Sequence, residues 1–353
     1  MMKKFYCIIP LLLFAFVTFS QNNTVENLWK IYNARKYDSV ISLTELLIKT
    51  DPNNKDFNLL LGRSYADKQE FNKAIPFLET VVKNDTNNSW KKHWGLLYLG
   101  NSYFMTQEYK DSKNSLEECI NLNITKLATN IALNSFRLFG YDRFYDNWII
   151  KESDNIRFHF QNLPGDKIEG FISSRDSAFK KINKFFRSSV PKKIDLFLWD
   201  SKEDLKNMIG TDIAFAKPEW CIVHLSYGQT PGHEITHVIS HFSSTGIVKT
   251  GLINEGTAVF FDQTNQDREM FIKNWIKANN KNIDIMEIWT NWTKYPYEIT
   301  YPLAGLFVKE LINKFGKDKF LKFFKNQTYE NAQLIFNEDI DPFIEEFENR
   351  VNE

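Results

Sequence analysis

The sequence contains few cysteines, glycines and prolines for its length. It has 3 Cys, 14 Gly and 10 Pro in 353 residues. So few cysteines exclude a small scaffold held together by disulfides, and the scarcity of turn-forming residues favours long helices over a turn-rich β-sandwich. Cys119 and Cys221 each lie in an apolar stretch, and we expect both to be buried free thiols.

The sequence also lacks a surplus of charge of either sign. Lys and Arg together number 44, as do Asp and Glu. A protein dedicated to binding nucleic acid would normally be basic, so nucleic acid is not an expected partner. Hydrophobic residues make up 43% of the chain and charged residues 25%, which excludes wholesale disorder. The length is sufficient for two ordinary domains.

Only one apolar run is long, and it lies at the N-terminus. Residues 5–19 are almost all apolar, follow the basic segment 1–4 and precede the polar run 21–24. This pattern is typical of a signal peptide, which we place at residues 1–20. A membrane anchor is the alternative, but a spanning helix normally needs about 20 apolar residues. We therefore expect an exported, periplasmic or secreted protein with no transmembrane anchor in its mature form.

Residues 21–147 contain a repeated pattern with a period of 34. One copy contains Leu61-Gly62, Tyr65, Ala74 and Leu78, and the next contains Leu99-Gly100, Tyr103, Ser112 and Leu116 at the matching positions. The two copies are 38 residues apart, because four extra residues lie in the connection between them. Small residues at these places allow two antiparallel helices to approach closely. The pattern resembles the tetratricopeptide repeat, which implies an all-α array with residues 126–144 as its capping helix.

This repeat resemblance implies either a surface for a peptide or protein partner or a scaffold for the following domain. A plain helical bundle is the alternative fold. The only histidine of the segment, His93, follows Trp90-Lys91-Lys92, and we expect it at the surface.

Residues 148–353 have a different pattern. Alternating apolar residues predict strands at 156–160, 193–199 and 220–225, and helical spacing predicts helices at 166–186 and 201–209. The remainder is mostly helical. An α+β domain is therefore expected, with the strand at 220–225 as the sheet edge along which a substrate backbone would lie.

A metal-binding pattern follows the last of these strands. His233 and His237 are four residues apart, so on a helix both imidazoles point to the same side and can bind one metal ion. Glu234 projects from the same helix beside them, where its carboxylate can take a proton from a water on the metal. Glu255 opens a second apolar helix, with 17 residues between it and His237, and can supply the third ligand that a catalytic zinc site needs.

The chain resembles the gluzincin metallopeptidases, which include thermolysin and aminopeptidase N. Three features carry this resemblance: the His-Glu-x-x-His motif, the distance from it to Glu255, and the sequence Asn254-Glu255-Gly256-Thr257-Ala258. The gap is one residue shorter than in the aminopeptidase N pattern. The resemblance implies a zincin-like α+β fold, Zn²⁺ held by His233, His237 and Glu255, and Glu234 as general base and acid. His241, one turn beyond His237, is a rival ligand that we expect to be a surface residue instead.

Many gluzincins also use a tyrosine or histidine downstream of the glutamate ligand to stabilise the oxyanion. The run from Tyr301 to Val308 resembles the tyrosine-led helix of the peptidase-MA-like members, so Tyr301 is our first candidate and Tyr297 the second. We expect the helix to run from Leu303 to Phe315.

The resemblance therefore predicts an exported zinc metallopeptidase behind helical repeats, acting on a peptide or protein substrate. The sequence lacks the Gly-x-Met-Glu-Asn motif with which aminopeptidase N relatives hold a free N-terminus, which favours an endopeptidase. A non-catalytic binding or assembly protein with a degenerate zinc site is the main alternative, and a zinc hydrolase acting on another bond is the second.

Overall fold

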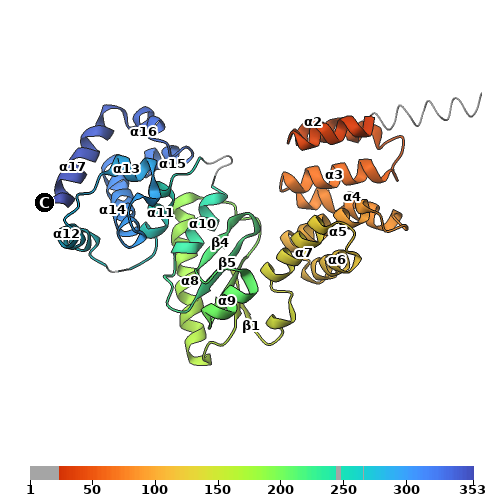
Figure 1. Ribbon diagram of the computed structural model, residues 1–353, viewed down its shortest axis with the longest axis horizontal. Coiled ribbons are helices and arrows are strands. Elements are labelled where there is room, and N and C mark those ends of the chain that lie inside the picture. Colours follow the sequence, from red (N-terminus) through yellow and green to blue (C-terminus); the bar gives the residue numbers. More distant parts are fainter. Residues whose placement is uncertain (1–23, 244–247, 265) are drawn as a thin grey trace, which may run out of the picture. The chain divides into compact units, whose positions relative to one another are not determined.

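The computed structural model of the protein describes residues 24–243, 248–264 and 266–353. The expected signal peptide lies outside these residues. The chain divides into two compact units, an N-terminal unit ending at Asp146 and a C-terminal unit beginning at Asn147 (Figure 1). Within the described residues, none of the helices combines the length and the apolar character needed to cross a bilayer.

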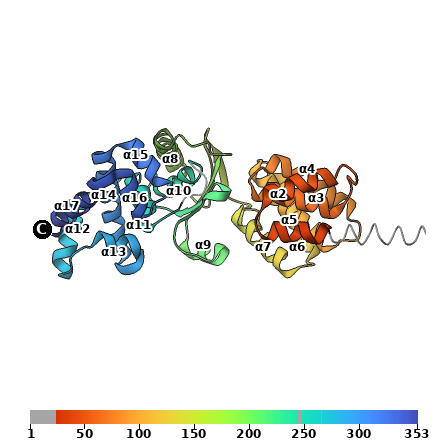
Figure 2. The same ribbon diagram turned by 90° about the horizontal axis from the view of Figure 1, so that it is seen from above.

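The N-terminal unit is all-helical, as predicted. A first helix includes residues 24–33. It is followed by α2 (Tyr37–Leu47), α3 (Lys55–Asp67), α4 (Phe71–Asn84), α5 (Trp90–Met105), α6 (Tyr109–Leu122) and α7 (Lys126–Leu138). These helices form a stack of hairpins, which Figure 2 shows from a second direction.

The repeated sequence positions lie at equivalent places in two successive hairpins. A Cβ atom added to Gly62 on α3 would lie 2.5 Å from the Leu78 side chain on α4, and one added to Gly100 on α5 would lie 2.7 Å from Leu116 on α6. The Ser112 hydroxyl on α6 donates to the Gly100 carbonyl at 2.7 Å. Glycine is therefore required where the helices of each pair cross, which explains the repeat in physical terms.

His93 is not at the surface, so that prediction is wrong. Its side chain is fully buried between α5, α6 and α7. The Nε2 atom lies 2.9 Å from the Cys119 carbonyl, and the backbone N–H of Thr125 donates to Nδ1 at 3.0 Å. Both ring nitrogens have partners, which allows a neutral imidazole to be buried. The prediction for the cysteines is confirmed, because Cys119 and Cys221 are both buried and free.

The C-terminal unit contains a five-stranded mixed sheet. Its strands are β1 (Ile149–Glu152), β2 (Ile156–Phe160), β3 (Ile194–Trp199), β4 (Phe215–Lys217) and β5 (Ile222–Ser226). They are arranged in the order β1-β2-β3-β5-β4, with β2, β3 and β5 parallel and the two outer strands antiparallel to their neighbours. The three predicted strands are present, whereas β1 and β4 were not predicted. The strand predicted at the sheet edge is β5, and that placement is wrong because β4 lies outside it.

Helices make up most of the remaining C-terminal unit. They are α8 (Gly165–Phe186), α9 (Lys202–Ile209), α10 (His233–His241), α11 (Gly251–Phe260), α12 (Arg268–Asn279), α13 (Ile285–Thr290), α14 (Tyr297–Phe315), α15 (Lys317–Phe324), α16 (Tyr329–Phe336) and α17 (Ile340–Asn352). Helix α8 covers one face of the sheet, where Phe171 packs edge-on against Phe158 and Phe160 of β2. Figure 1 shows this long helix beside the strands and next to α10.

The other face of the sheet carries a buried charged cluster. Asp195 on β3 accepts from Lys192 and is bonded to the His159 Nε2 atom on β2 at 2.8 Å. Burial disfavours the ionised carboxylate, but Lys192 and His159 more than compensate and lower the pKa of Asp195 to about 2. Burial lowers the pKa of His159, although Asp195 opposes that shift, so the imidazole is neutral at pH 7.

This cluster predicts a loss of stability in acid. The contribution of Asp195 is present above its unfolded pKa of about 4 and is lost as the pH falls towards 2. Below about pH 6.5, His159 also favours unfolding, because it binds a proton more readily in the unfolded chain. We expect Asp195→Asn to lower the free energy of unfolding by about 3 kcal/mol at pH 7.

Calorimetry of the full chain tests this expectation, since it can separate the transitions of two units. The difference in unfolding temperature between wild type and Asp195→Asn should become smaller as the pH falls from 4 to 2. Equal unfolding temperatures of wild type and Asp195→Asn at pH 7 would show that the charge of Asp195 contributes nothing to stability.

Candidate metal centre

The candidate metal ligands come from two helices that approach each other closely. Helix α10 begins at His233, directly after Gly232, and α11 carries Glu255 in its second turn. A Cβ atom added to Gly232 would lie 1.9 Å from the Phe261 carbonyl oxygen at the end of α11. Only glycine fits there, and the close approach brings the start of α10 against the second helix.

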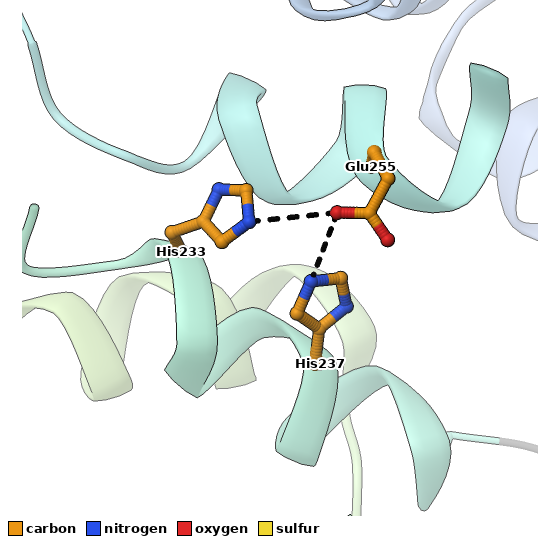
Figure 3. Close-up of side chains that lie close together, drawn as sticks. All are labelled: His233, His237 and Glu255. Atoms are coloured by element: carbon orange, nitrogen blue, oxygen red, sulfur yellow. Dashed lines mark ion pairs between the residues drawn. The ribbon is translucent and has the colours of Figure 1, made fainter. Parts of the chain in front are cut away.

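Three ligand atoms converge between these helices. The Glu255 Oε2 atom lies 3.5 Å from the His233 Nε2 atom and 3.3 Å from the His237 Nε2 atom (Figure 3). One donor atom from each residue lies within 4.8 Å of the other two. The structure therefore brings together the three side chains that the sequence identified, and in it they form a possible metal-binding triad.

The spacing of this triad fits zinc. In a tetrahedral site with metal–ligand distances of about 2.1 Å, neighbouring donor atoms lie about 3.4 Å apart. The two distances to Glu255 agree with that value. Two imidazoles and one carboxylate are also the donor types of catalytic zinc sites, which keep a further position open for water or substrate.

Within the triad, His233 and Glu255 shift each other's pKa values towards the charged forms. Burial opposes ionisation of Glu255, but hydrogen bonds and charge interactions with His233 and His237 overcome it and lower the pKa of the carboxyl well below its usual range. Burial disfavours the charged form of His233, yet the neighbouring carboxylates raise its pKa. A carboxylate held ionised between two imidazoles is a suitable environment for a divalent cation.

Glu234 lies beside the triad without belonging to it. Burial raises the pKa of its carboxyl, and the charges of His233 and His237 partly offset that shift. Its side chain forms no hydrogen bond or ion pair with another side chain among residues 24–243, 248–264 and 266–353. The carboxylate is therefore close to the ligands and available for proton transfer.

Asn254 is a site residue to which sequence reasoning assigned no role. Its Nδ2 atom donates to Glu255 Oε1 at 3.0 Å and lies 3.4 Å from the His237 Nδ1 atom. Both contacts use atoms that do not face the centre of the triad. Asn254 thus holds the Glu255 ligand in place through its hydrogen bond to Oε1, as residues behind metal ligands commonly do. The signal that could have identified it was its position directly before Glu255.

Tyr301 also lies at the site. Its ring is 5.8 Å from the ring of His233. Burial raises the pKa of its hydroxyl, and the charges of Glu255 and Glu234 raise it further, so the hydroxyl keeps its proton and can donate. Tyr297 is 58% exposed, with its ring 5.9 Å from that of Tyr301.

Close packing of α14 against α11 determines the position of Tyr301. A Cβ atom added to Gly256 would lie 2.5 Å from the Ala304 carbonyl oxygen of α14. The helix begins at Tyr297 and continues through Pro302, so the predicted start at Leu303 is six residues too late. Pro296, which immediately precedes the helix, marks the true start.

The other histidines of the C-terminal unit lie elsewhere. His241 is the last residue of α10, with its ring packed on Phe242. His224 is buried in β5 and accepts a hydrogen bond from the Trp199 indole at 2.9 Å. His159 belongs to the Asp195 cluster on the sheet.

No known protein-family model matches this chain, and no curated protein matches it.

Proposed function

We propose that this protein is an exported zinc metallopeptidase of the gluzincin type. The observation that supports this proposal best is the convergence of the His233 and His237 Nε2 atoms on one oxygen of Glu255. Glu234 lies one residue after a ligand and, among the described residues, has no hydrogen bond or ion pair with another side chain, so it adds the proton-accepting group that such an enzyme needs.

Each site residue has a distinct role in peptide hydrolysis. His233, His237 and Glu255 would hold a zinc ion, which would supply Lewis acidity for activating water, lowering its pKa towards about 7, and for polarising the scissile carbonyl. The Glu234 carboxylate accepts a proton from the attacking water and passes it to the leaving amine nitrogen. The Tyr301 hydroxyl donates a hydrogen bond to the carbonyl oxygen as negative charge develops there. Asn254 keeps Glu255 in position.

The substrate is a peptide or an unfolded protein segment. Within the part of the chain that the structure describes, strand β4 pairs only with β5, so its other edge can align an extended substrate backbone. The sequence lacks the motif that would hold a free N-terminus, which favours internal cleavage.

The N-terminal hairpins serve as a tetratricopeptide-type module. Glycine at the crossing of each helix pair and the sequence period both support this assignment. The module binds a protein partner or substrate, or acts as a scaffold for the peptidase domain.

The test is a cleavage assay on an unstructured protein with purified mature chain. Activity should be lost on treatment with a zinc chelator and restored when zinc is added back, because the triad holds the ion that activates water. Stoichiometric zinc without cleavage of any of several unstructured proteins would contradict the peptidase proposal and favour a binding or assembly protein. Zinc-dependent hydrolysis of an ester, with no peptide cleavage, would favour a different hydrolase.

A further inference from the structure

A second candidate site lies between α8 and the turn that leads from β5 to α10. It is a cavity of about 470 Å³ lined by Lys167, Phe171 and Arg175 of the helix and by Tyr227 and Gln229 of the turn. None of these residues belongs to the metal triad. We refer to this cavity as the Arg175 pocket.

Arg175 is buried there without a counter-charge. The residue is only 8% exposed, and its guanidinium stacks on the Phe171 ring at 3.7 Å. Its Nη2 atom donates to the Gln229 carbonyl at 2.7 Å and its Nη1 atom to the Ser174 hydroxyl at 2.9 Å. Both partners are neutral, and the Nε atom has no hydrogen-bond partner among residues 24–243, 248–264 and 266–353.

Such an arrangement is unusual for a structural arginine. Buried cations are normally paired with a carboxylate, because desolvating an isolated charge is costly. Among the described residues, no carboxylate forms an ion pair with Arg175. Burial lowers the pKa of its guanidinium to about 10. A buried cation without a counter-charge that lines a cavity is a candidate binding group for an anionic ligand.

Lys167 adds a second positive charge to the same pocket. It lies two turns before Arg175 on the same face of α8, with its ammonium 5.3 Å from the centre of the Tyr227 ring. Lys167 and Tyr227 are both exposed, so a ligand can reach the pocket from solvent. Two cations, a phenol and an aromatic wall suit a carboxylate attached to an organic group.

The pocket is close to the metal centre along the chain. Gln229 precedes the metal ligand His233 by four residues. Four residues span at most about 14 Å, which is also the reach of about four extended substrate residues. One peptide can therefore extend from the metal centre towards the Arg175 pocket.

We propose that the Arg175 pocket binds a carboxylate of the peptide substrate, within about four residues of the bond that is cleaved. The carboxylate is an Asp or Glu side chain or the peptide's own C-terminus. This inference rests on the proposed peptidase function, whose substrate class it narrows to acidic peptides.

Binding to the metal-free full-length protein tests the pocket without requiring turnover. Three matched hexapeptides are compared by calorimetry: a neutral one with an amidated C-terminus, the same peptide with one Glu, and the neutral peptide with a free C-terminus. We expect one of the two carboxylate peptides to bind ~10–100-fold more tightly than the neutral one, the range that charge-assisted hydrogen bonds give. The Glu peptide gains affinity if the pocket takes a side chain, and the free C-terminus does so if it takes the chain end.

The variants Arg175→Met and Lys167→Gln should each remove most of that preference and leave binding of the neutral peptide unchanged. Lys181→Gln is the matched control, because this exposed lysine lies on the same helix but outside the pocket. Arg175→Met should unfold at the same temperature as wild type or higher, since it removes an uncompensated buried charge. A lower unfolding temperature with an unchanged preference for carboxylate peptides would instead assign Arg175 a structural role.

Equal affinity of wild type for all three peptides overturns the inference, as does a preference that survives in Lys167→Gln and Arg175→Met. If Arg175→Met does not fold, Lys167→Gln decides, because its exposed side chain is not needed for packing. Cleavage of peptides without any preference for a carboxylate leaves the peptidase proposal intact and refutes only the pocket. A carboxylate preference in binding, without zinc-dependent cleavage, supports the pocket and refutes the peptidase.

Discussion

Glu234→Gln is expected to retain one zinc ion per chain and to lose peptidase activity by ~10²–10⁴-fold, the contribution typical of a general acid–base group. Glutamine has nearly the same shape as glutamate but cannot accept a proton from the attacking water. Glu234 is not one of the three converging ligands, so its replacement leaves the metal triad complete. The loss should therefore appear in turnover and not in metal content.

The matched controls are His233→Ala and Glu255→Ala, which each remove one of the three ligands. These variants should lose zinc as well as activity, because two protein ligands remain where a catalytic zinc site needs three. Metal analysis by mass spectrometry and a cleavage assay on the same samples separate the two classes. Full activity in Glu234→Gln would refute the mechanism, and stoichiometric zinc in both alanine variants would refute the ligand assignment.

The triad could be predicted from sequence because most of its geometry is local. A spacing of four residues places His233 and His237 on one side of any helix, whatever the rest of the fold is. The position of Glu255 next to the two histidines could not be predicted in this way, because it depends on how α10 and α11 pack. Gly232 and Gly256 permit that packing, but a glycine in a sequence does not say which backbone it will approach.

The sheet was predicted only in part, for a related reason. The three central strands are almost entirely buried, and each carries enough apolar residues in an alternating pattern to be predicted from the sequence. Strand β1 has four exposed residues and β4 has only three residues, so neither shows a periodic pattern. Because β4 was not predicted, its neighbour β5 was expected at the edge of the sheet. Short outer strands are defined by pairing with a neighbour, which is a tertiary property.

His93 and Arg175 show the same limit for polar side chains. The residues around His93 are basic and aromatic, which suggested a surface position. Its burial depends on partners 26 and 32 residues further along the chain. Arg175 lies on an amphipathic helix like many exposed arginines, and its partner Gln229 is 54 residues away. Long-range hydrogen bonds of this kind leave no periodic signal in the sequence.

Tyr301→Phe is expected to reduce kcat by ~10²–10³-fold, as removal of an oxyanion donor typically does. The phenyl ring preserves the packing against His233, so folding, zinc content and KM should change little. The hydroxyl is the only group removed, and it is needed only when negative charge develops on the carbonyl oxygen. Steady-state kinetics with metal analysis on the same preparation measures this separation.

Tyr297→Phe is the matched control, because Tyr297 lies one turn earlier on α14 and is mostly exposed. It should retain kcat within about twofold, since an exposed side chain that does not enter the site contributes little to transition-state binding. If Tyr301→Phe retains wild-type kcat and Tyr297→Phe does not, the donor is Tyr297 and α14 must move when substrate binds. If neither variant is impaired, oxyanion stabilisation depends on the zinc ion alone, and the contact between Tyr301 and the site is packing.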